Sequence, residues 1–573
     1  MDIGFWIMIV AWAFVLVWVP IIIFSNRKVH PRALFVLFFA EMWERFSYYG
    51  MRALLTLYMA KELFKALTEF EARSEALAIY GSYTSMVYLT PIIGGILADK
   101  VLGFRKAVIF GGLLMTAGHF ALALEGMVFP GNMVLFFLSL AFIIVGNGFF
   151  KPNISSFLGN FYSLNDSRKD GAFTIFYMGV NIGSLLAIVT CGYVGEQISW
   201  HYGFGLAGIG MLLGLFVFWL AGPTVFGKKG INPTSMENFP EVNEEEDIKL
   251  LHGTKEDRIA ALEKDAENFE LINDSKTKRR QWLTYFLTIA AIPVVSLFLN
   301  LSDIVTWALI ILSVGILGVL YVMSLKQESS KADATILDHP DAQNGKAAKE
   351  RLWVVIVLFV FHAVFWALFE QAGGSVTLFT DTNVDRMVFG SEIPASIFQF
   401  FNAFFIMTLA PVFSFIWMKL RASKKEPSTP MKFVLGLSQL ALGFVFLVVG
   451  SKVFADNGLV PVVFLALMYL FHSTGELSLS PVGLSMITKL SPKKTVGFVM
   501  GAWFLSIALA NKMAGLIGGL TASEDVSESV GLEELLNVYS STYLTWGVLV
   551  VGGAAVILFL TVPKLRKWMN GIH

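Results

Sequence analysis

The chain has 573 residues, of which 55% are hydrophobic and 15% are charged, and its formal net charge at pH 7 is zero. A soluble protein of this length is rarely so apolar, and a neutral chain has no general electrostatic attraction to nucleic acid. The single cysteine, Cys191, excludes disulfides, structural zinc sites and iron–sulfur clusters within one chain. We therefore interpret the sequence as an all-α polytopic membrane protein.

The first apolar run, residues 3–24, is long enough to cross a bilayer. It has no basic segment before it and no small-residue cleavage site after it, so we expect an uncleaved helix and not a signal peptide. The basic cluster at 26–32 follows at once and should face the cytoplasm. Residues 1–30 are thus expected to form an extra N-terminal transmembrane helix with a basic linker, with the N-terminus outside.

The rest of the chain divides into two sets of six apolar spans around a polar middle. The first set covers 31–222, with spans at about 31–60, 78–98, 105–124, 132–156, 171–194 and 203–222. Next come a cytoplasmic loop at 223–281 with a surface helix near 255–271, a two-helix insert at 282–325 and a second cytoplasmic loop at 326–350. The second set covers 351–562, with spans at about 351–380, 394–420, 432–450, 460–488, 496–520 and 541–562, before a cytoplasmic tail at 563–573.

The distribution of charge supports this layout. The predicted inner loops carry Lys and Arg, whereas the last outer loop, 521–536, has five acidic residues and no Lys or Arg. Six spans, a long cytoplasmic middle and six more spans are typical of two pseudo-symmetric bundles. We expect a multi-pass protein of the cell membrane with a cytoplasmic C-terminus.

The second span carries charged and polar side chains on one face. At 100° per residue, an arc of about 140° contains Glu41, Glu44, Arg45, Tyr48, Tyr49 and Arg52. Each ionised group at the bilayer centre costs on the order of 2.5–3.5 kcal/mol. These groups therefore face protein or a water-filled cavity, and they form either a substrate or proton path or a polar seam that holds helices together.

Two further spans of the first set carry polar side chains. Lys151 lies in the inner half of its span beside Pro152, either as a buried functional cation or as a side chain that snorkels to the inner surface. Asn181 shares one helical face with Tyr177 and Ser184. Its amide could bind a polar ligand or a neighbouring helix.

Counting residues at 1.5 Å each predicts two ion pairs at different depths. Arg52 and Glu370 lie at the same depth in the outer half, and such a pair would close the outer side of a cavity. Lys151 and Glu476 lie at a similar depth toward the inner half, and this pair would close the inner side.

Four other side chains are weaker candidates. His362 is either functional or a neutral packed histidine, and the alternatives of cavity lining and helix packing stay open for Gln399, Asn402 and Trp503.

Several motifs together resemble the proton-dependent oligopeptide transporter (POT/PTR) family, of prokaryotic type, within the major facilitator superfamily. They are Glu41-x-x-Glu44-Arg45-Phe46 with Tyr48-Tyr49-Gly50, the segment 94–106, Phe150-Lys151-Pro152-Asn153, Phe176-Tyr177 with Asn181 and Gly183-Ser184-Leu185, Phe365-Trp366 with Glu370-Gln371, and Gly475-Glu476-Leu477 with Ser480-Pro481. The resemblance spans about 31–562 and implies the major facilitator fold, two six-helix bundles with a two-helix insert, here with one extra N-terminal helix.

The resemblance also implies roles. Glu41, Glu44 and Arg45, with Glu370 and Glu476, would couple transport to protons. Arg45 and Lys151 would hold a peptide carboxylate, and Glu476 with Asn181 and Asn402 would hold the peptide ammonium group. The substrate pocket would further include Tyr48, Tyr49, Tyr88, Ser480 and Trp503. The gates would be Arg52–Glu370 outside and Lys151–Glu476 inside.

Three departures from the family pattern stand out. The histidine that animal members carry in the second core span is replaced here, near Gly81. The helix at 3–24 lies outside the usual layout. Phe369 stands where nitrate-carrying plant relatives have a functional histidine, and this weakens a nitrate interpretation.

The expected function is proton-coupled import of di- and tripeptides by alternating access; the alternative is a carrier of nitrate, another small anion or a peptide-like metabolite. We expect no enzymatic activity, because the sequence has no HExxH, GxSxG or Cys/His cluster. We expect no cofactor, with protons as the coupling ion. The partners would be peptide and the lipid bilayer of a bacterial inner membrane, with no nucleic acid and with a functional monomer.

Overall fold

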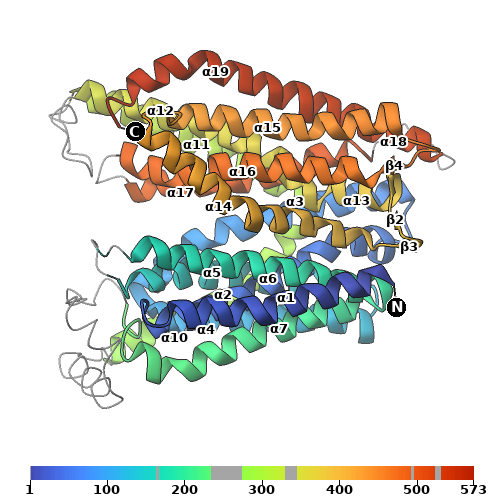
Figure 1. Ribbon diagram of the computed structural model, residues 1–573. Coiled ribbons are helices and arrows are strands. Elements are labelled where there is room, and N and C mark those ends of the chain that lie inside the picture. Colours follow the sequence, from blue (N-terminus) through green and yellow to red (C-terminus); the bar gives the residue numbers. More distant parts are fainter. Residues whose placement is uncertain are drawn as a thin grey trace. The chain divides into compact units, whose positions relative to one another are not determined.

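The computed structural model describes residues 2–162, 166, 168–233, 274–329, 345–491, 496–522 and 531–572. The surface helix expected near 255–271 lies outside these residues. Figure 1 shows that the described chain is built almost entirely of long helices.

A helix is present in every predicted span. Fourteen described helices are long and apolar enough to cross a membrane. The charged second helix, α2 (Arg32–Tyr58), is not among them because its polar stripe lowers its hydropathy, and it brings the number of long spans to fifteen.

In the first half of the chain the elements are α1 (Ile3–Asn26), α2 (Arg32–Tyr58), η1 (Met59–Leu63), α3 (Glu69–Leu97), η2 (Ala98–Leu102), α4 (Phe104–Val128), α5 (Met133–Gly159), α6 (Lys169–Gln197), α7 (Trp200–Ala221) and η3 (Gly222–Phe226). The insert is α10 (Ser275–Asn300) and α11 (Ser302–Ser329).

In the second half they are α12 (Gly345–Phe369), η6 (Glu370–Gly373), α13 (Ser375–Asn383), β1 (Val384–Asp385), β2 (Met387–Val388), β3 (Ser391–Glu392), η7 (Ala395–Gln399), α14 (Phe400–Ala422), α15 (Thr429–Val449), η8 (Gly450–Phe454), β4 (Val460–Pro461), α16 (Val462–Leu490), α17 (Val496–Gly519), α18 (Leu532–Thr542), η9 (Tyr543–Val550) and α19 (Val551–Trp568).

The chain forms two compact units. The first unit is Met1–Leu54, Leu89–Asn300 and Phe389–Phe400, and the second is Leu55–Tyr88, Leu301–Val388 and Phe401–His573. The chain passes from one unit to the other inside α2, inside α3 and between the two helices of the insert. These ranges differ from the predicted bundles of 31–222 and 351–562, whose boundaries stay a prediction.

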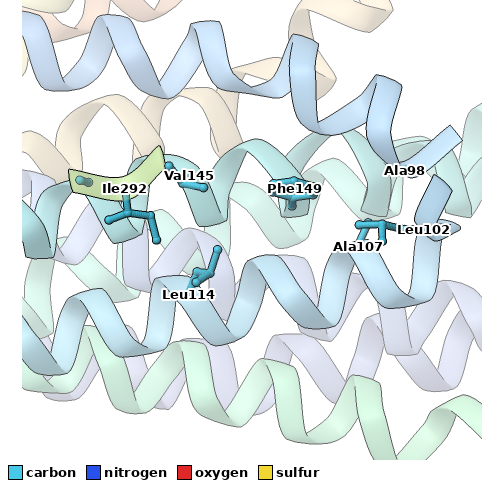
Figure 2. Close-up of a cluster of buried hydrophobic side chains, with 8 residues drawn as sticks. Ala98, Leu102, Ala107, Leu114, Val145, Phe149 and Ile292 are labelled. Carbon is cyan, nitrogen blue, oxygen red and sulfur yellow. The ribbon is translucent and has the colours of Figure 1, made fainter. Parts of the chain in front are cut away.

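In the first unit, the insert helix α10 packs on α4 and α5. Ile292 of α10 belongs to the same buried apolar cluster as Leu114 of α4 and Val145 of α5, and Figure 2 shows these side chains close together. Gln281, near the start of α10, accepts a hydrogen bond from Lys106 Nζ at 3.0 Å and donates one to Val101 O, also at 3.0 Å. Helix α10 is therefore an integral part of this unit.

Helix α1 lies along α6 in the same unit. Trp12 Nε1 donates a hydrogen bond to Thr190 Oγ1 at 2.9 Å, and Tyr193 OH donates one to Asp2 Oδ2 at 3.1 Å. Trp6 and Val17 are among the exposed apolar side chains on the rest of α1, at 54% and 62%. One face of the helix thus packs on α6, and the remainder suits lipid.

In the second unit, α11 packs on α12 and α17, and α15 on α16 and α19. The strand β1 pairs in parallel with β4, with Val384 opposite Val460. Helix α12 ends in the short 3₁₀ turn η6, before α13 begins. A single straight span was predicted at 351–380, so this interruption at Glu370 is a structural finding.

Candidate functional site

The charged stripe of α2 forms a buried ion-pair cluster in the first unit. Arg45 Nε lies 2.8 Å from Glu41 Oε1 and 2.6 Å from Glu44 Oε2. Glu44 is fully buried, and Glu41 and Arg45 are each only 4% exposed. Two carboxylates share one guanidinium, so the three side chains carry a formal excess of one negative charge when both acids are ionised. A bound proton would remove this excess.

Helix α5 adds an amide and a cation to the same cluster. Asn147 Nδ2 donates a hydrogen bond to Glu44 Oε1 at 3.0 Å. Lys151, one helical turn later, is close enough to act electrostatically on Glu44. Asn147 was not among the predicted site residues, although its position four residues before Lys151 places it on the same helical face and was the available signal.

Two glycines let neighbouring helices approach this cluster. A Cβ on Gly183 of α6 would lie only 2.1 Å from Met42 O of α2, and one on Gly148 of α5 would lie 2.8 Å from Thr90 Cβ of α3. Any larger residue would push these helices apart, so the sequence at both positions fixes how tightly the cluster is enclosed.

The tyrosines of α2 extend the stripe as predicted. The guanidinium carbon of Arg45 lies 5.9 Å from the ring centre of Tyr48, and that of Arg52 lies 5.8 Å from the ring centre of Tyr49. Both distances fit cation–π contacts. Tyr88 is half-buried and belongs to the second unit.

Asn181 uses its amide within its own helix. Its Nδ2 donates to Tyr177 O at 3.0 Å, and the residue is 9% exposed. This bond is not the contact with a neighbouring helix that was one of the two alternatives.

The second unit contains a separate acidic site on α14 and α16. Asn402 Nδ2 lies 3.3 Å from Glu476 Oε2 and 3.1 Å from Ser473 Oγ, and it donates to both. Ser473 was not among the predicted site residues. The side chain of Ser480 lies outside the described residues. A carboxylate held by an amide and placed beside a hydroxyl is a suitable anchor for an ammonium group.

His362 is a packed histidine. Its Nδ1 lies 2.7 Å from Ser506 Oγ, and its Nε2 accepts a hydrogen bond from Trp366 Nε1 at 2.8 Å. An indole nitrogen only donates, so Nε2 carries a lone pair and the ring is neutral. The ring also lies 3.9 Å from that of Trp503, centre to centre. Of the two alternatives for His362, the geometry favours the neutral packed one, and it gives Trp503 a packing partner.

The predicted gates join residues of different units. Arg52 and Lys151 belong to the first unit, and Glu370 and Glu476 to the second. Glu370 is 3% exposed in η6. Both gate pairs stay predictions.

Gln399 Nε2 donates a hydrogen bond to Ala53 O at 3.4 Å within the first unit. This bond joins η7 to α2 and is a packing contact.

Among the described residues, no three His, Cys, Asp or Glu side chains are grouped so that they could hold a metal ion. The described chain does contain membrane-length helices with ionisable groups buried among them, including Glu41, Glu44 and Arg45 in the first unit and Glu370 in the second. This is the arrangement of a membrane transporter for a charged or zwitterionic solute.

Comparison with known proteins identifies the family. The model of the POT family (PTR2) matches residues 105–292 and 319–536. The chain is 34% identical to the peptide transporter YePEPT of Yersinia enterocolitica, over 94% of this chain and 96% of that protein, and 33% identical to a di-/tripeptide transporter of Lactococcus lactis, over 83% and 86%. The chain belongs to the POT family.

Solved structures agree with this assignment. A crystal structure of a mutant POT peptide transporter in complex with alafosfalin is 33% identical, with a TM-score of 0.72 over 95% of this chain and 96% of that one. A POT family transporter in complex with 5-aminolevulinic acid is 29% identical, with a TM-score of 0.71 over 94% and 97%. These matches confirm the predicted major facilitator type of fold.

Proposed function

We propose that this protein imports di- and tripeptides together with protons, by alternating access and without chemical change of the peptide. The observation that carries the proposal is the buried Glu41–Arg45–Glu44 cluster. Peptide transport by relatives that cover nearly the whole chain supports the same substrate class.

A short peptide is a zwitterion, and it needs a positive and a negative anchor at a fixed spacing. Arg45 and Lys151 of the first unit would hold the peptide carboxylate. Glu476 would hold the ammonium group, with Asn402, which already contacts it, and Asn181. The tyrosines of α2 with Tyr88, Ser480 and Trp503 would line the space for variable side chains.

Proton coupling follows from competition for Arg45. When a peptide carboxylate binds the guanidinium, Glu41 and Glu44 lose part of their ion pairing with Arg45. A buried carboxylate without its counter-ion favours protonation, so peptide and proton bind together. One proton moving down a potential of 100 mV supplies about 2.3 kcal/mol, equivalent to about 50-fold accumulation. Protons would be the coupling ion, with no further cofactor.

The remaining assignments belong to the same proposal. Arg52–Glu370 would close the outer side and Lys151–Glu476 the inner side, and protonation of Glu44, Glu370 or Glu476 would change which side is open. The protein would act as a monomer in the bacterial inner membrane, with the N-terminus outside and the C-terminus in the cytoplasm.

The decisive measurement is uptake of labelled dialanine into proteoliposomes with an imposed inward proton gradient, and with an uncoupler as control. Gradient-dependent accumulation that other di- and tripeptides inhibit, and that nitrate and free alanine do not, is the expected result. Uptake of nitrate or of a peptide-like metabolite in place of peptides would favour the alternative carrier. Absence of any short-peptide uptake by correctly inserted protein would contradict the proposal.

A further inference from the structure

A buried lysine in the second unit is not used by the proposed mechanism. Lys512 of α17 is 1% exposed. Its Nζ lies 2.6 Å from Ser302 Oγ, 2.7 Å from Ser82 Oγ and 3.3 Å from Ala78 O. An ammonium group has three donors and no acceptor, so these three oxygens match its full capacity. Ser82 in turn donates to Ala78 O at 2.9 Å, which leaves its oxygen free to accept from the lysine.

The charge of Lys512 is compensated as well as its hydrogen bonds. Glu75 of α3 and Asp303 of α11 are both close enough to act electrostatically on the ammonium group. An unpaired buried charge would be strongly unfavourable. The buried ammonium group of Lys512 therefore keeps its hydrogen-bond and charge partners only while three helices, α3, α11 and α17, stay together around it.

Close backbone packing brings Lys512 to α3. A Cβ on Gly81 would lie 2.9 Å from the Cα of Gly515, and one on Gly515 would lie 2.7 Å from Leu77 O. The two helices touch through glycines one turn from Lys512.

Two of the helices that Lys512 joins, α3 and α11, lie at points where the chain crosses between the two units. Ser302 comes directly after Leu301, the first residue of the second unit in the insert, and Ser82 lies six residues before Tyr88, the last residue of the second unit in α3. Lys512 fixes both crossing segments to α17 on the side of the second unit.

We infer that Lys512 is a positioning residue that keeps one side of the transporter closed. This side is formed by the parts of α3, α11 and α17 that surround Lys512. Through its hydrogen bond to Ser302, the lysine also ties the two-helix insert to the closed arrangement. The charge pattern of the sequence places this side outside, and in that respect the inference rests on the proposed function. Opening this side would separate α3 from α17, expose Leu77 and break the hydrogen bonds of the lysine.

The test measures exposure of Leu77, which is fully buried in the closed arrangement and packs near Gly374, Gly515 and Gly518. The background is Cys191→Ala with Leu77→Cys as the only cysteine. Reconstituted protein is treated with a membrane-impermeant maleimide. Lys512→Met, which keeps the length of the side chain but removes its charge and donors, should speed labelling by about tenfold or more, as expected for loss of charge-assisted hydrogen bonds. Ser302→Ala should speed it about threefold, as expected for one hydrogen bond.

Two controls separate opening from unfolding. Lys61→Met removes another lysine of the same unit, one that pairs with Asp381 at 2.6 Å but is 45% exposed, and it should change labelling by less than about twofold. A second reporter, Met115→Cys in the fully buried interior of α4, should stay unlabelled in every variant. Labelling at position 115 in the Lys512→Met variant would mean general unfolding and would overturn the inference.

Other outcomes are equally decisive. Labelling of the Lys512→Met variant within twofold of the parent would overturn the inference, and an unchanged rate in Ser302→Ala alone would overturn the part assigned to the insert. The parent is also tested for exchange of dialanine across the membrane without a gradient. Failure of that exchange with the labelling pattern intact would count against the peptide substrate but not against Lys512, because the labelling requires no substrate.

Discussion

Two three-residue ion clusters in this protein have opposite composition and different surroundings. In α2, two acids share one base, all within 4% exposure. At the loop between α14 and α15, two bases share one acid, here called the loop cluster: Glu426 in the loop lies 2.8 Å from Nε of Arg421 at the end of α14 and 2.6 Å from Nζ of Lys432 at the start of α15. The side chains of Arg421, Glu426 and Lys432 are 76%, 21% and 8% exposed. The same kinds of side chain are therefore used in two different electrostatic environments.

In the loop cluster the acid has two basic partners, whereas in the α2 cluster one oxygen of Glu41 lacks a hydrogen-bond donor in the described part of the chain. The two basic side chains hold the pKa of Glu426 at about 2, chiefly through the hydrogen bond from Arg421, so this acid stays ionised across the physiological range. In α2, Glu41 Oε2 is buried and accepts no hydrogen bond from the described residues. Glu41, Glu44 and Arg45 alone carry one excess negative charge, which only the more distant Lys151 offsets; a proton bound at one of the two carboxylates would remove that excess. The difference teaches that burial and stoichiometry, more than residue type, separate the proposed coupling site from a structural ion cluster.

Replacing the shared base should produce the largest contrast between the two clusters. Arg45→Met leaves two buried carboxylates without their guanidinium and should destabilise the protein by about 3–5 kcal/mol and abolish uptake. Arg421→Met, the matched change in the exposed cluster, should cost no more than about 1 kcal/mol. Thermal unfolding in detergent and dialanine uptake measure both. Equal effects of the two substitutions would refute the comparison.

A neutral isostere at Glu44 tests coupling without removing the side chain. Glu44→Gln removes the charge and the titrating proton, and it should remove proton-driven accumulation, about 50-fold at 100 mV, while exchange of dialanine without a gradient continues. Glu426→Gln serves as the control and should accumulate peptide as the parent does. Gradient-driven accumulation in the Glu44 variant at the level of the parent would contradict the coupling role.

The acidic site of the second unit extends the comparison to a carboxylate with a different partner. Glu476→Gln keeps a hydrogen-bonding group beside Asn402 but cannot attract an ammonium group or release a proton. We expect proton-driven uptake to be lost, with a raised KM for any remaining exchange. Undiminished concentrative uptake would defeat the assignment of Glu476.

The smallest expected effect is the pH dependence of the loop cluster. The folded-state pKa of Glu426, about 2, lies below its ordinary value of 4.5, so its ion pairs contribute stability above pH 4.5 and lose it as the pH falls toward 2. The difference in melting temperature between the parent and Glu426→Gln should thus be constant from pH 5 to 8 and shrink below pH 4.5. A difference that instead grows on acidification would have the wrong sign.

Hydropathy and charge predicted a helix in each observed span, because a chain segment that crosses a bilayer must be long and apolar. Their ends were less predictable. Helix α3 begins at Glu69, nine residues before the predicted span, because its first turns are charged and give no hydropathy signal. The interruption after Phe369 contains no proline, and it was missed although the glycine pair at 373–374 was an available signal.

The site was predictable where it lies on one helix and unpredictable where it depends on packing. Glu41, Glu44 and Arg45 follow from helical periodicity alone. Asn147 shares a helical face with Lys151, but its contact with Glu44, like the contact of Ser473 with Asn402, depends on which helices meet. Lys512 was hidden in an apolar run at 496–520 because one lysine hardly changes its hydropathy. Each gate pair takes one residue from each unit. Counting residues along helices gives the depth of each residue but not the distance between residues of different units.

The pairing of α1 with α6 has a consequence for the time course of membrane insertion. The hydrogen bond from Trp12 to Thr190 spans 178 residues of chain, and at translation rates of 5–20 residues per second this distance takes about 10–40 s to synthesise. During that interval α1 has no α6 to contact and must be stable in lipid alone. Its uninterrupted apolar sequence meets this requirement from the start, whereas α2 emerges next with charges whose partner on α5, Asn147, arrives 103 residues after Glu44. The extra helix thus supplies a membrane anchor during the period in which the charged helix still lacks its partners.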